Sequence, residues 1–300
     1  MSQALRKRVT SEKLIAYLFA LPAIVIVLTL YGYPIVRAFI LGFYKWNMLA
    51  NTGKFLGLKN YLHVLQDYDF WHAAAITLIW VGGVLVLQIL LGIGGALLLN
   101  EPLWGRNIAR GLVMFPWVVP TVVAAVIFRF MFNDVFGFVN YALRQMGMIK
   151  QPILWLSTPH GAMIAIILIT AWKWFPFFLI MFLSRLQTIS KELYDAAKID
   201  GANFWKRFMY ITLPMLMPVI LIALLFRTIW LIGKFDIVWL FTHGGPGNST
   251  TTLALYIYMQ AFERYKMGIG ASIAFINLSF VSLIVITYLY FYQRAEERLS

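Results

Sequence analysis

Four basic side chains lie inside long apolar runs of this sequence, namely Arg129, Lys173, Arg227 and Lys234. Guanidinium and ammonium groups donate charge-assisted hydrogen bonds to carboxylates and phosphates, and these bonds are stronger in a water-poor setting. The chemistry that such residues indicate is the binding of an anion, with no covalent step.

Two of these cations, Arg227 and Lys234, share a helical period. Arg227, Trp230, Leu231 and Lys234 follow the spacing i, i+3, i+4 and i+7, which predicts one helical stripe about 10 Å long. Two alternatives stay open. Arg129, near the end of its run, is expected to reach the membrane interface. The other cations are explained equally by bonds to buried acids or helix carbonyls, and Asp236 is a candidate partner although i, i+2 spacing places it off the helix face of Lys234.

Catalytic motifs do not occur in the sequence. The histidines His63, His72, His160 and His243 are scattered, and neither an H-E-x-x-H metal motif nor a G-x-S-x-G nucleophile motif is present. Cysteine is absent. Gly53-Lys54 and Gly233-Lys234 lack the upstream glycine and following hydroxyl of a phosphate-binding loop. We therefore predict no catalytic residue, metal or cofactor in this chain.

The composition is typical of a chain whose solvent is lipid. Of 300 residues, 61% are hydrophobic and 12% charged, with mean hydropathy +0.78. Soluble domains are about a quarter charged and avoid large exposed apolar patches. The net charge of +13 does not indicate nucleic-acid binding, because the basic residues lie in short loops without a basic, aromatic stripe.

Six apolar runs are each long enough to cross a bilayer, which takes about 20 helical residues. They span residues 14–35, 73–99, 111–132, 161–184, 214–240 and 268–292. Because isolated spans in lipid must be helical, we predict an all-α integral membrane protein of six transmembrane helices, forming one domain over 1–300. Bends are expected at the prolines in these runs, Pro22, Pro116, Pro120, Pro176 and Pro218.

The placement of charge predicts the orientation and the surroundings of the central cations. With both termini inside, the inner segments carry 13 Lys and Arg in 61 residues and the outer ones 8 in 92, which favours an N-in, C-in topology. The first run is too long for a signal peptide and is expected to be an uncleaved helix. Lys173 and Arg227, mid-span, would together cost roughly 5–7 kcal/mol facing lipid, so they are expected to face a watery cavity.

The loop at 185–213, the longest predicted inner connection, has helical content of its own. Ser190 is expected to cap a helix from Lys191, Gly201 to end it with a left-handed turn, and a second helix to start near Asn203 and enter the membrane at Pro214. From the residues alone, two short helices projecting from the bilayer and one amphipathic helix lying on the lipid are both compatible with this pattern.

The same loop resembles the EAA signature of ATP-binding-cassette (ABC) importer permeases, EAA-x3-G-x9-I-x-LP. Asp195-Ala196-Ala197, Gly201 and Ile211-Thr212-Leu213-Pro214 stand at the required spacings, with Asp195 in place of the usual Glu. Residues 55–61 (FLGLKNY), 114–132 and 241–262 (with Gly244-Gly245-Pro246) are similar to further family segments. The resemblance covers nearly the whole chain and points to the carbohydrate branch, as in the maltose-type larger permease, with a type I importer fold.

The resemblance implies roles for two groups of residues. Those that would dock on the ATPase subunit and couple to it are Glu192, Asp195, Ala196, Ala197, Asp200, Gly201, Ala202, Phe204 and Pro214. Those that would line the substrate path are Thr170, Lys173, Trp174, Phe177, Arg227, Trp230, Leu231 and Lys234. The family carries neutral polar or aromatic residues at the latter positions, and the three cations here depart from that pattern, which favours an anionic substrate.

The implied assembly is a multi-pass permease of the bacterial cytoplasmic (inner) membrane. Its expected partners are a second six-helix permease, two ATPase subunits that bind ATP and Mg²⁺, and an extracytoplasmic solute-binding protein. The expected cargo is an acidic oligosaccharide, such as a uronate oligomer; glycerol phosphates and their diesters, or neutral oligosaccharides, are alternatives. A secondary transporter would require inverted repeats and membrane carboxylates, of which Asp236 is the one mid-span candidate. A membrane enzyme lacks a catalytic constellation.

Overall fold

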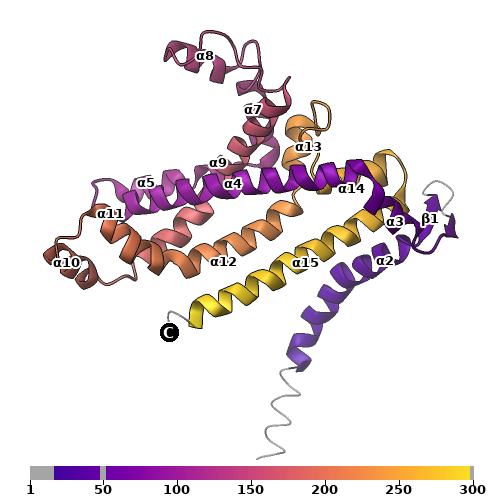
Figure 1. Ribbon diagram of the computed structural model, residues 1–300, viewed down its shortest axis with the longest axis horizontal. Helices are drawn as coiled ribbons and strands as arrows, with labels where there is room; N and C mark the ends of the chain where they lie inside the picture. Colours follow the sequence, from indigo (N-terminus) through magenta and orange to yellow (C-terminus); the bar gives the residue numbers. More distant parts are fainter. Residues whose placement is uncertain (1–16, 48–51, 298–300) are drawn as a thin grey trace, which may run out of the picture. The chain divides into compact units, whose positions relative to one another are not determined.

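The computed structural model describes residues 17–47 and 52–297, which are mostly helical (Figure 1). Five helices are long and apolar enough to cross a membrane, and a bent pair makes a sixth span if counted as one. They are Tyr17–Leu41, Tyr68–Asn100, Pro159–Leu186, Phe204–Ile232 and Met267–Tyr290, with Arg106–Val118 plus Thr121–Met131 as the bent pair. These spans correspond to the six predicted runs. The start of the first run and the basic residues Arg6, Lys7 and Arg8 lie outside the described residues.

The contacts divide the chain into two units. The first holds the chain up to Gln66 together with Ile257–Ile276, and the second holds Asp67–Tyr256 together with the chain from Asn277. Each unit is described by itself, and the predicted single domain over 1–300 stays a prediction.

The first unit joins the first span to a small hairpin. Its elements are η1 (Leu28–Gly32, a π-helical turn), α2 (Tyr33–Leu41), β1 (Tyr44–Asn47), β2 (Thr52–Phe55), α3 (Lys59–Gln66), η3 (Met259–Glu263) and the first part of α15 (Met267–Glu297). Strands β1 and β2 pair antiparallel, with Tyr44 opposite Phe55. The buried amide of Asn60 donates to the carbonyls of Gly42 (2.9 Å) and Tyr44 (3.0 Å), and so fixes α3 against the hairpin.

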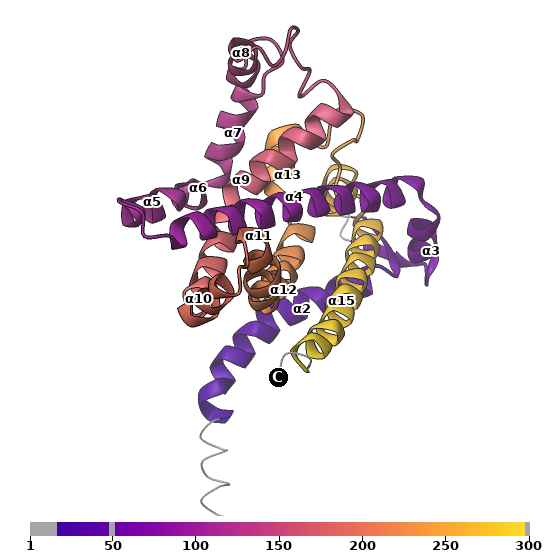
Figure 2. The ribbon, with the colours of Figure 1, turned by 60° about the vertical axis from the view of Figure 1, so that its left-hand side comes forward.

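The second unit holds the remaining spans. Its elements are α4 (Tyr68–Asn100), α5 (Arg106–Val113), α6 (Phe115–Val118), α7 (Thr121–Met131), α8 (Phe138–Gln145), α9 (Pro159–Leu186), α10 (Lys191–Ile199), α11 (Phe204–Arg207), η2 (Phe208–Thr212), α12 (Leu213–Ile232), α13 (Asp236–Thr242) and most of α14 (Leu253–Tyr258). Figure 2 shows α8 at the end of α7 that lies away from α6.

Close packing of α4 on α9 forms the centre of this unit. Phe178 and Phe182 of α9 are fully buried against Ala96 of α4, and Leu216 of α12 completes the cluster. A Cβ atom on Gly92 would lie 2.7 Å from the Cβ of Phe178. The absence of a side chain at Gly92 therefore allows the two helices to approach closely, as small residues do between membrane helices.

Two of the predicted spans are broken. The third bends by 91° between Val118 and Thr121, because Pro120 has no amide hydrogen to continue the helix. The run at 214–240, predicted as one span, is corrected: α12 ends at Ile232 and α13 begins at Asp236. Gly233 ends the helix, and the amide of Lys234 donates to the Leu231 carbonyl at 2.9 Å.

Candidate functional site

Three cations surround the indole ring of Trp174 in the middle of α9. The Lys173 and Lys234 ammonium nitrogens each lie 5.2 Å from the ring centroid, and the Arg227 Cζ lies 4.7 Å from it. Trp174 is buried, and the three cations come from α9, from α12 and from the break that follows α12. Each contact lies within the range of a cation–π interaction, which a ring face makes with positive charge. We call Lys173, Trp174, Arg227 and Lys234 the cation cluster.

Each cation of the cluster also has a polar partner within the chain. Lys173, which is 3% exposed, donates from its ammonium to the carbonyl of Val119 at the bend of the third span, where Pro120 supplies no amide to that turn. Lys234 lies 3.2 Å from the Asp236 carboxylate. These are the carbonyl and carboxylate contacts that the alternative interpretation of the cations requires.

Arg227 is held by a residue that the sequence reasoning did not single out. Its Nε donates to the Oε1 of Gln88 (3.1 Å), and the Gln88 amide donates to the Thr170 carbonyl (3.3 Å). Gln88 is fully buried in α4. A lone amide in the apolar run 73–99 was the available signal, since buried polar groups in a membrane span need partners.

Some hydrogen-bonding capacity around the cluster is unused. The Arg227 Nη2, the Thr170 Oγ1 and the Asp236 Oδ1 are buried without a hydrogen-bond partner. Buried polar atoms are normally paired, so these three atoms are exceptions. Lys173 and Arg227 are 3% and 2% exposed, so the prediction that they face a watery cavity is wrong for the described residues: helix packing and intrachain partners bury them instead.

The predicted stripe over Arg227, Trp230, Leu231 and Lys234 is helical as far as Leu231, and its side chains differ in exposure. Arg227 and Leu231 are buried within the unit, whereas Trp230 is 53% exposed, and Lys234 lies beyond the end of the helix. Trp230 packs instead beside the half-buried Phe177, at 6.0 Å between ring centroids. Arg129 is exposed in the last turn of α7.

The loop at 185–213 forms the two predicted helices. The Ser190 hydroxyl accepts from the Glu192 amide (3.2 Å) and caps α10, as expected. Gly201 takes the left-handed φ of +76° that ends α10, and the Asn203 side chain caps α11 by accepting from the Lys206 amide at 2.9 Å. From Phe204 the chain continues as helix into the span that ends at Ile232. We call residues 190–207, the part of the 185–213 loop that holds most of the residues predicted to couple to the ATPase, the coupling loop.

One face of α10 is solvated and the opposite face is attached to the body of the unit. Glu192, Asp195, Ala196 and Ile199, at i, i+3, i+4 and i+7, are all exposed, and Ile199 is 87% exposed. On the other side, the Tyr194 hydroxyl contacts the Thr212 hydroxyl at 3.0 Å. Ile199 was not among the predicted coupling residues, because no signature position covers it.

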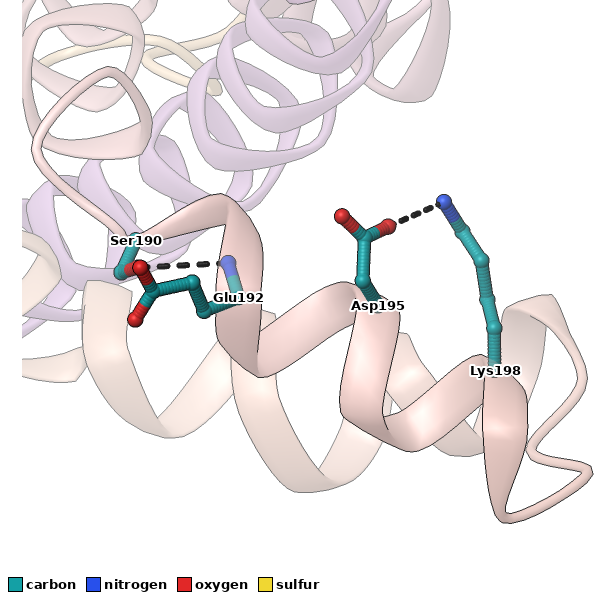
Figure 3. Close-up of polar contacts among 4 residues, drawn as sticks. All are labelled: Ser190, Glu192, Asp195 and Lys198. Atoms are coloured by element: carbon teal, nitrogen blue, oxygen red, sulfur yellow. Dashed lines mark hydrogen bonds and ion pairs between the residues drawn. The ribbon is translucent and has the colours of Figure 1, made fainter.

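Asp195 forms an ion pair inside the coupling loop. Its carboxylate accepts from the Lys198 ammonium at 2.8 Å (Figure 3). The hydrogen bond from Lys198 and its charge lower the pKa of the Asp195 carboxyl below its ordinary value. Since both side chains are more than half exposed, the pair is weak and exchangeable.

The other predicted coupling residues lie in or beside the same loop. Asp200 follows the last turn of α10 and is exposed, Ala197 and Ala202 are half-buried, Phe204 stacks on Phe208, and Pro214 is in the first turn of α12. Among the described residues, no group of three or more His, Asp or Glu side chains is arranged to hold a metal ion.

Comparison with known proteins shows the family of this chain. Residues 88–297 match the family model described as "Binding-protein-dependent transport system inner membrane component". The chain is 37% identical to the trehalose/maltose transport system permease protein MalF of Thermococcus litoralis, over 93% of each chain. It is 36% identical to the sulfoquinovosyl glycerol transport system permease protein SmoG of Agrobacterium fabrum, over 93% of this chain and 90% of the relative.

Two further similarities agree with this relationship. The lactose transport system permease protein LacF of Rhizobium radiobacter is 35% identical over 94% of each chain. A crystal structure of a bacterial ABC transporter for the acidic polysaccharide alginate contains a chain of the same fold, with TM-score 0.77, 24% identity, and coverage of 97% of this chain and 99% of that chain.

The chain therefore belongs to the binding-protein-dependent ABC transporter permeases of the carbohydrate-uptake type. It is a multi-pass inner-membrane permease subunit, and it is not the ATPase of its transporter.

Proposed function

We propose that the solute carried by this permease is an acidic oligosaccharide. Its carboxylates bind the cation cluster, and the exposed ring of Trp230 contacts its sugar rings, whereas the buried ring of Trp174 holds the three cations. The observation that carries the proposal is that three cations share one buried indole, whereas Asp236 is the one acid paired with them in the described part of the chain. The excess positive charge, with the orphaned Arg227 Nη2, is matched by a carboxylate that forms a paired hydrogen bond.

The remaining predicted path residues have positioning roles in this proposal. Thr170 holds Gln88 through its carbonyl and has an unpartnered hydroxyl, Phe177 supports Trp230, and Leu231 is fully buried one turn after Arg227. Acidic sugars need both features of such a site, which are cations for the carboxylates and aromatic faces for the apolar faces of the rings.

A neutral oligosaccharide is the second candidate. It is favoured by the intrachain partner that each cation already has, and by relatives named for trehalose/maltose and for lactose. Another relative is named for sulfoquinovosyl glycerol. The names of these relatives all refer to carbohydrates, and they do not distinguish a neutral solute from an anionic one for this chain. Glycerol phosphates and their diesters are the remaining anionic alternative.

We further propose that the coupling loop docks on an ATPase subunit. The exposed face of α10, with Glu192, Asp195, Ala196 and Ile199, offers two carboxylates and an isoleucine to a basic and apolar cleft. Gly201 sets the turn after α10, and the continuous helix from Phe204 to Ile232 transmits movement of the loop toward Arg227. A second permease and two ATPase subunits complete the transporter, and a solute-binding protein delivers the substrate from outside for transport by alternating access.

The experiment is a matched pair of substrates. The transporter is reconstituted with its ATPase and binding-protein partners, and ATP hydrolysis is measured with uronate oligomers and with oligomers of equal length whose carboxylates are reduced to alcohols. The proposal expects stimulation by the acidic oligomers at least tenfold above that by the reduced ones. Equal stimulation, or stimulation by maltose-type sugars alone, would reject an acidic substrate and favour the second candidate.

A further inference from the structure

A cavity lined by basic and apolar side chains lies behind the coupling loop, and none of its lining residues belongs to the cation cluster. It encloses about 560 Å³ between the connection that follows α4 and the two helices of the loop. This volume is within the range of about 300–1,000 Å³ that is typical of small-ligand sites. All of its lining residues belong to the second unit.

The charges that line this cavity are strongly unequal. Four cations, Arg106, Lys191, Lys198 and Arg207, face one acid, Glu101. Lys198 is partly neutralised by Asp195, at 2.8 Å. The other three cations have no ion-pair partner within 4 Å among the described residues. Like charges around one cavity repel one another, and a bound anion relieves that repulsion.

Arg207 provides an independent observation that points to a ligand. Its Nε is buried and has no hydrogen-bond partner, and Arg207 is one of the residues that line the cavity. An arginine presents its N–H groups as a planar fork that matches the oxygens of a phosphate group. A phosphate oxygen would satisfy the orphaned donor.

The walls of the cavity are held in place and partly apolar. The contact between the Tyr194 and Thr212 hydroxyls (3.0 Å) ties α10 to the start of the span that follows α11. Leu97, Leu186 and Phe208 line the cavity beside the cations. Basic pockets at the predicted cytoplasmic ends of membrane helices have the chemistry that recognises phosphorylated headgroups.

We propose that this cavity binds a phosphate ester through Arg106, Lys191 and Arg207. The phosphate comes either from the headgroup of an acidic phospholipid or from a soluble phosphorylated metabolite. Because the cavity is bounded by α10 and α11, its occupancy braces the coupling loop against the body of the permease. This inference does not depend on the charge of the transported sugar.

The test uses the complete transporter in phosphatidylcholine nanodiscs. In one arm, phosphatidylglycerol is added and the lipid retained per complex is counted by native mass spectrometry. In the other arm, inorganic phosphate and glycerol 3-phosphate are titrated by calorimetry. The double variant Arg106→Gln/Arg207→Gln is expected to lose at least tenfold in affinity for whichever phosphate compound binds. The control Arg144→Gln/Lys150→Gln removes the same charge from α8 and the segment after it, and is expected to bind like wild type.

A third variant distinguishes a loss of binding from a loss of folding. Glu101→Gln removes the one acid of the lining and is expected to tighten phosphate binding two- to fivefold, which a damaged fold would not do. Binding of phosphatidylglycerol alone identifies the lipid as the source, and binding of inorganic phosphate identifies a soluble ligand. The proposal is overturned if neither probe binds, or if binding is the same in wild type, the double variant and Glu101→Gln.

Discussion

Lys234 and Asp236 form an ion pair at 3.2 Å although they stand only two residues apart. In a continuous helix residues at i and i+2 point to different sides. The pair exists because α12 ends at Ile232 and α13 starts at Asp236, so that Lys234 lies in the non-helical break and Asp236 in the first turn of the next helix. The break thus brings Lys234 to Trp174 and supplies the cluster with its one acid among the described residues.

Replacing this acid should strengthen the binding of acidic solutes. The variant Asp236→Asn removes the carboxylate that competes for the Lys234 ammonium. For a partly exposed ion pair the competing interaction is worth about 0.5–1 kcal/mol, so the KM for uronate oligomers should fall roughly two- to fivefold. The KM for a neutral sugar should stay unchanged. A rise in the KM for the acidic oligomer would contradict the role given to Lys234.

Gln88 should be essential for stability because it satisfies a buried arginine. Gln88→Leu leaves the Arg227 Nε without its acceptor, and an unsatisfied buried donor costs about 1–3 kcal/mol. The thermal unfolding temperature of the detergent-purified complex should therefore fall. The double variant Gln88→Leu/Arg227→Met should recover most of the loss, because no buried guanidinium is left without its acceptor. If the two substitutions simply added their destabilising effects, Gln88 and Arg227 would not act as a pair.

Backbone strain introduced by a side chain at position 201 should weaken the stimulation of ATP hydrolysis by solute. A Cβ at this position meets nothing within 4 Å, so Gly201→Ala introduces only the cost of a left-handed residue, about 1–2 kcal/mol. Solute-stimulated ATPase activity should decrease severalfold. Gly147→Ala is the matched control, since Gly147 also has positive φ (+70°) and free space but lies outside the coupling loop. Equal effects of both variants would mean that Gly201 serves folding alone.

Docking through α10 predicts different effects for the two members of its ion pair. Asp195→Asn should reduce co-purification of the ATPase, and Ile199→Ser should reduce it further by removing an exposed apolar contact. Lys198→Gln breaks the same ion pair but leaves the carboxylate, so the ATPase should stay bound. Equal losses in Asp195→Asn and Lys198→Gln would assign Asp195 to the stability of the loop.

The pKa of Asp195 adds a condition to this experiment. Because Lys198 lowers that pKa from its ordinary value of 3.8, the carboxylate stays charged as the pH falls, and its contribution is lost only in still more acidic solution. ATPase binding by wild type should therefore not change between about pH 8 and pH 5 through this group. A loss of ATPase in that interval would have to arise from another residue.

The features that follow from local pattern could be predicted from the sequence. Apolar run length gives the spans within several residues, and Ser190 and Gly201 give the bounds of α10, because caps and left-handed turns depend on neighbouring residues alone.

The bend of the third span at Pro120 was predicted from its proline, but the break after Ile232 could not be predicted in this way. Both sides of the break after Ile232 are apolar, so hydropathy does not distinguish one long span from a span and a short helix. The partner of Arg227 could not be predicted from the sequence either. Gln88 and Arg227 are 139 residues apart, and only the packing of the helices brings them together. Sequence reasoning placed Lys234 on a helical stripe. In the structure Lys234 lies in the break after α12, and from there its ammonium lies over the ring of Trp174.

The most direct test of an acidic substrate is uptake by proteoliposomes that contain the complete transporter with Arg227→Gln/Lys234→Gln. ATP-driven uptake of labelled uronate oligomers should fall at least a hundredfold relative to wild type, because two of the three cations are lost. Uptake should remain at the wild-type level in Arg129→Gln, whose cation is exposed at the end of α7. Undiminished uptake of the acidic oligomers by the double variant, with the complex intact, would contradict the assignment of the cation cluster to substrate binding.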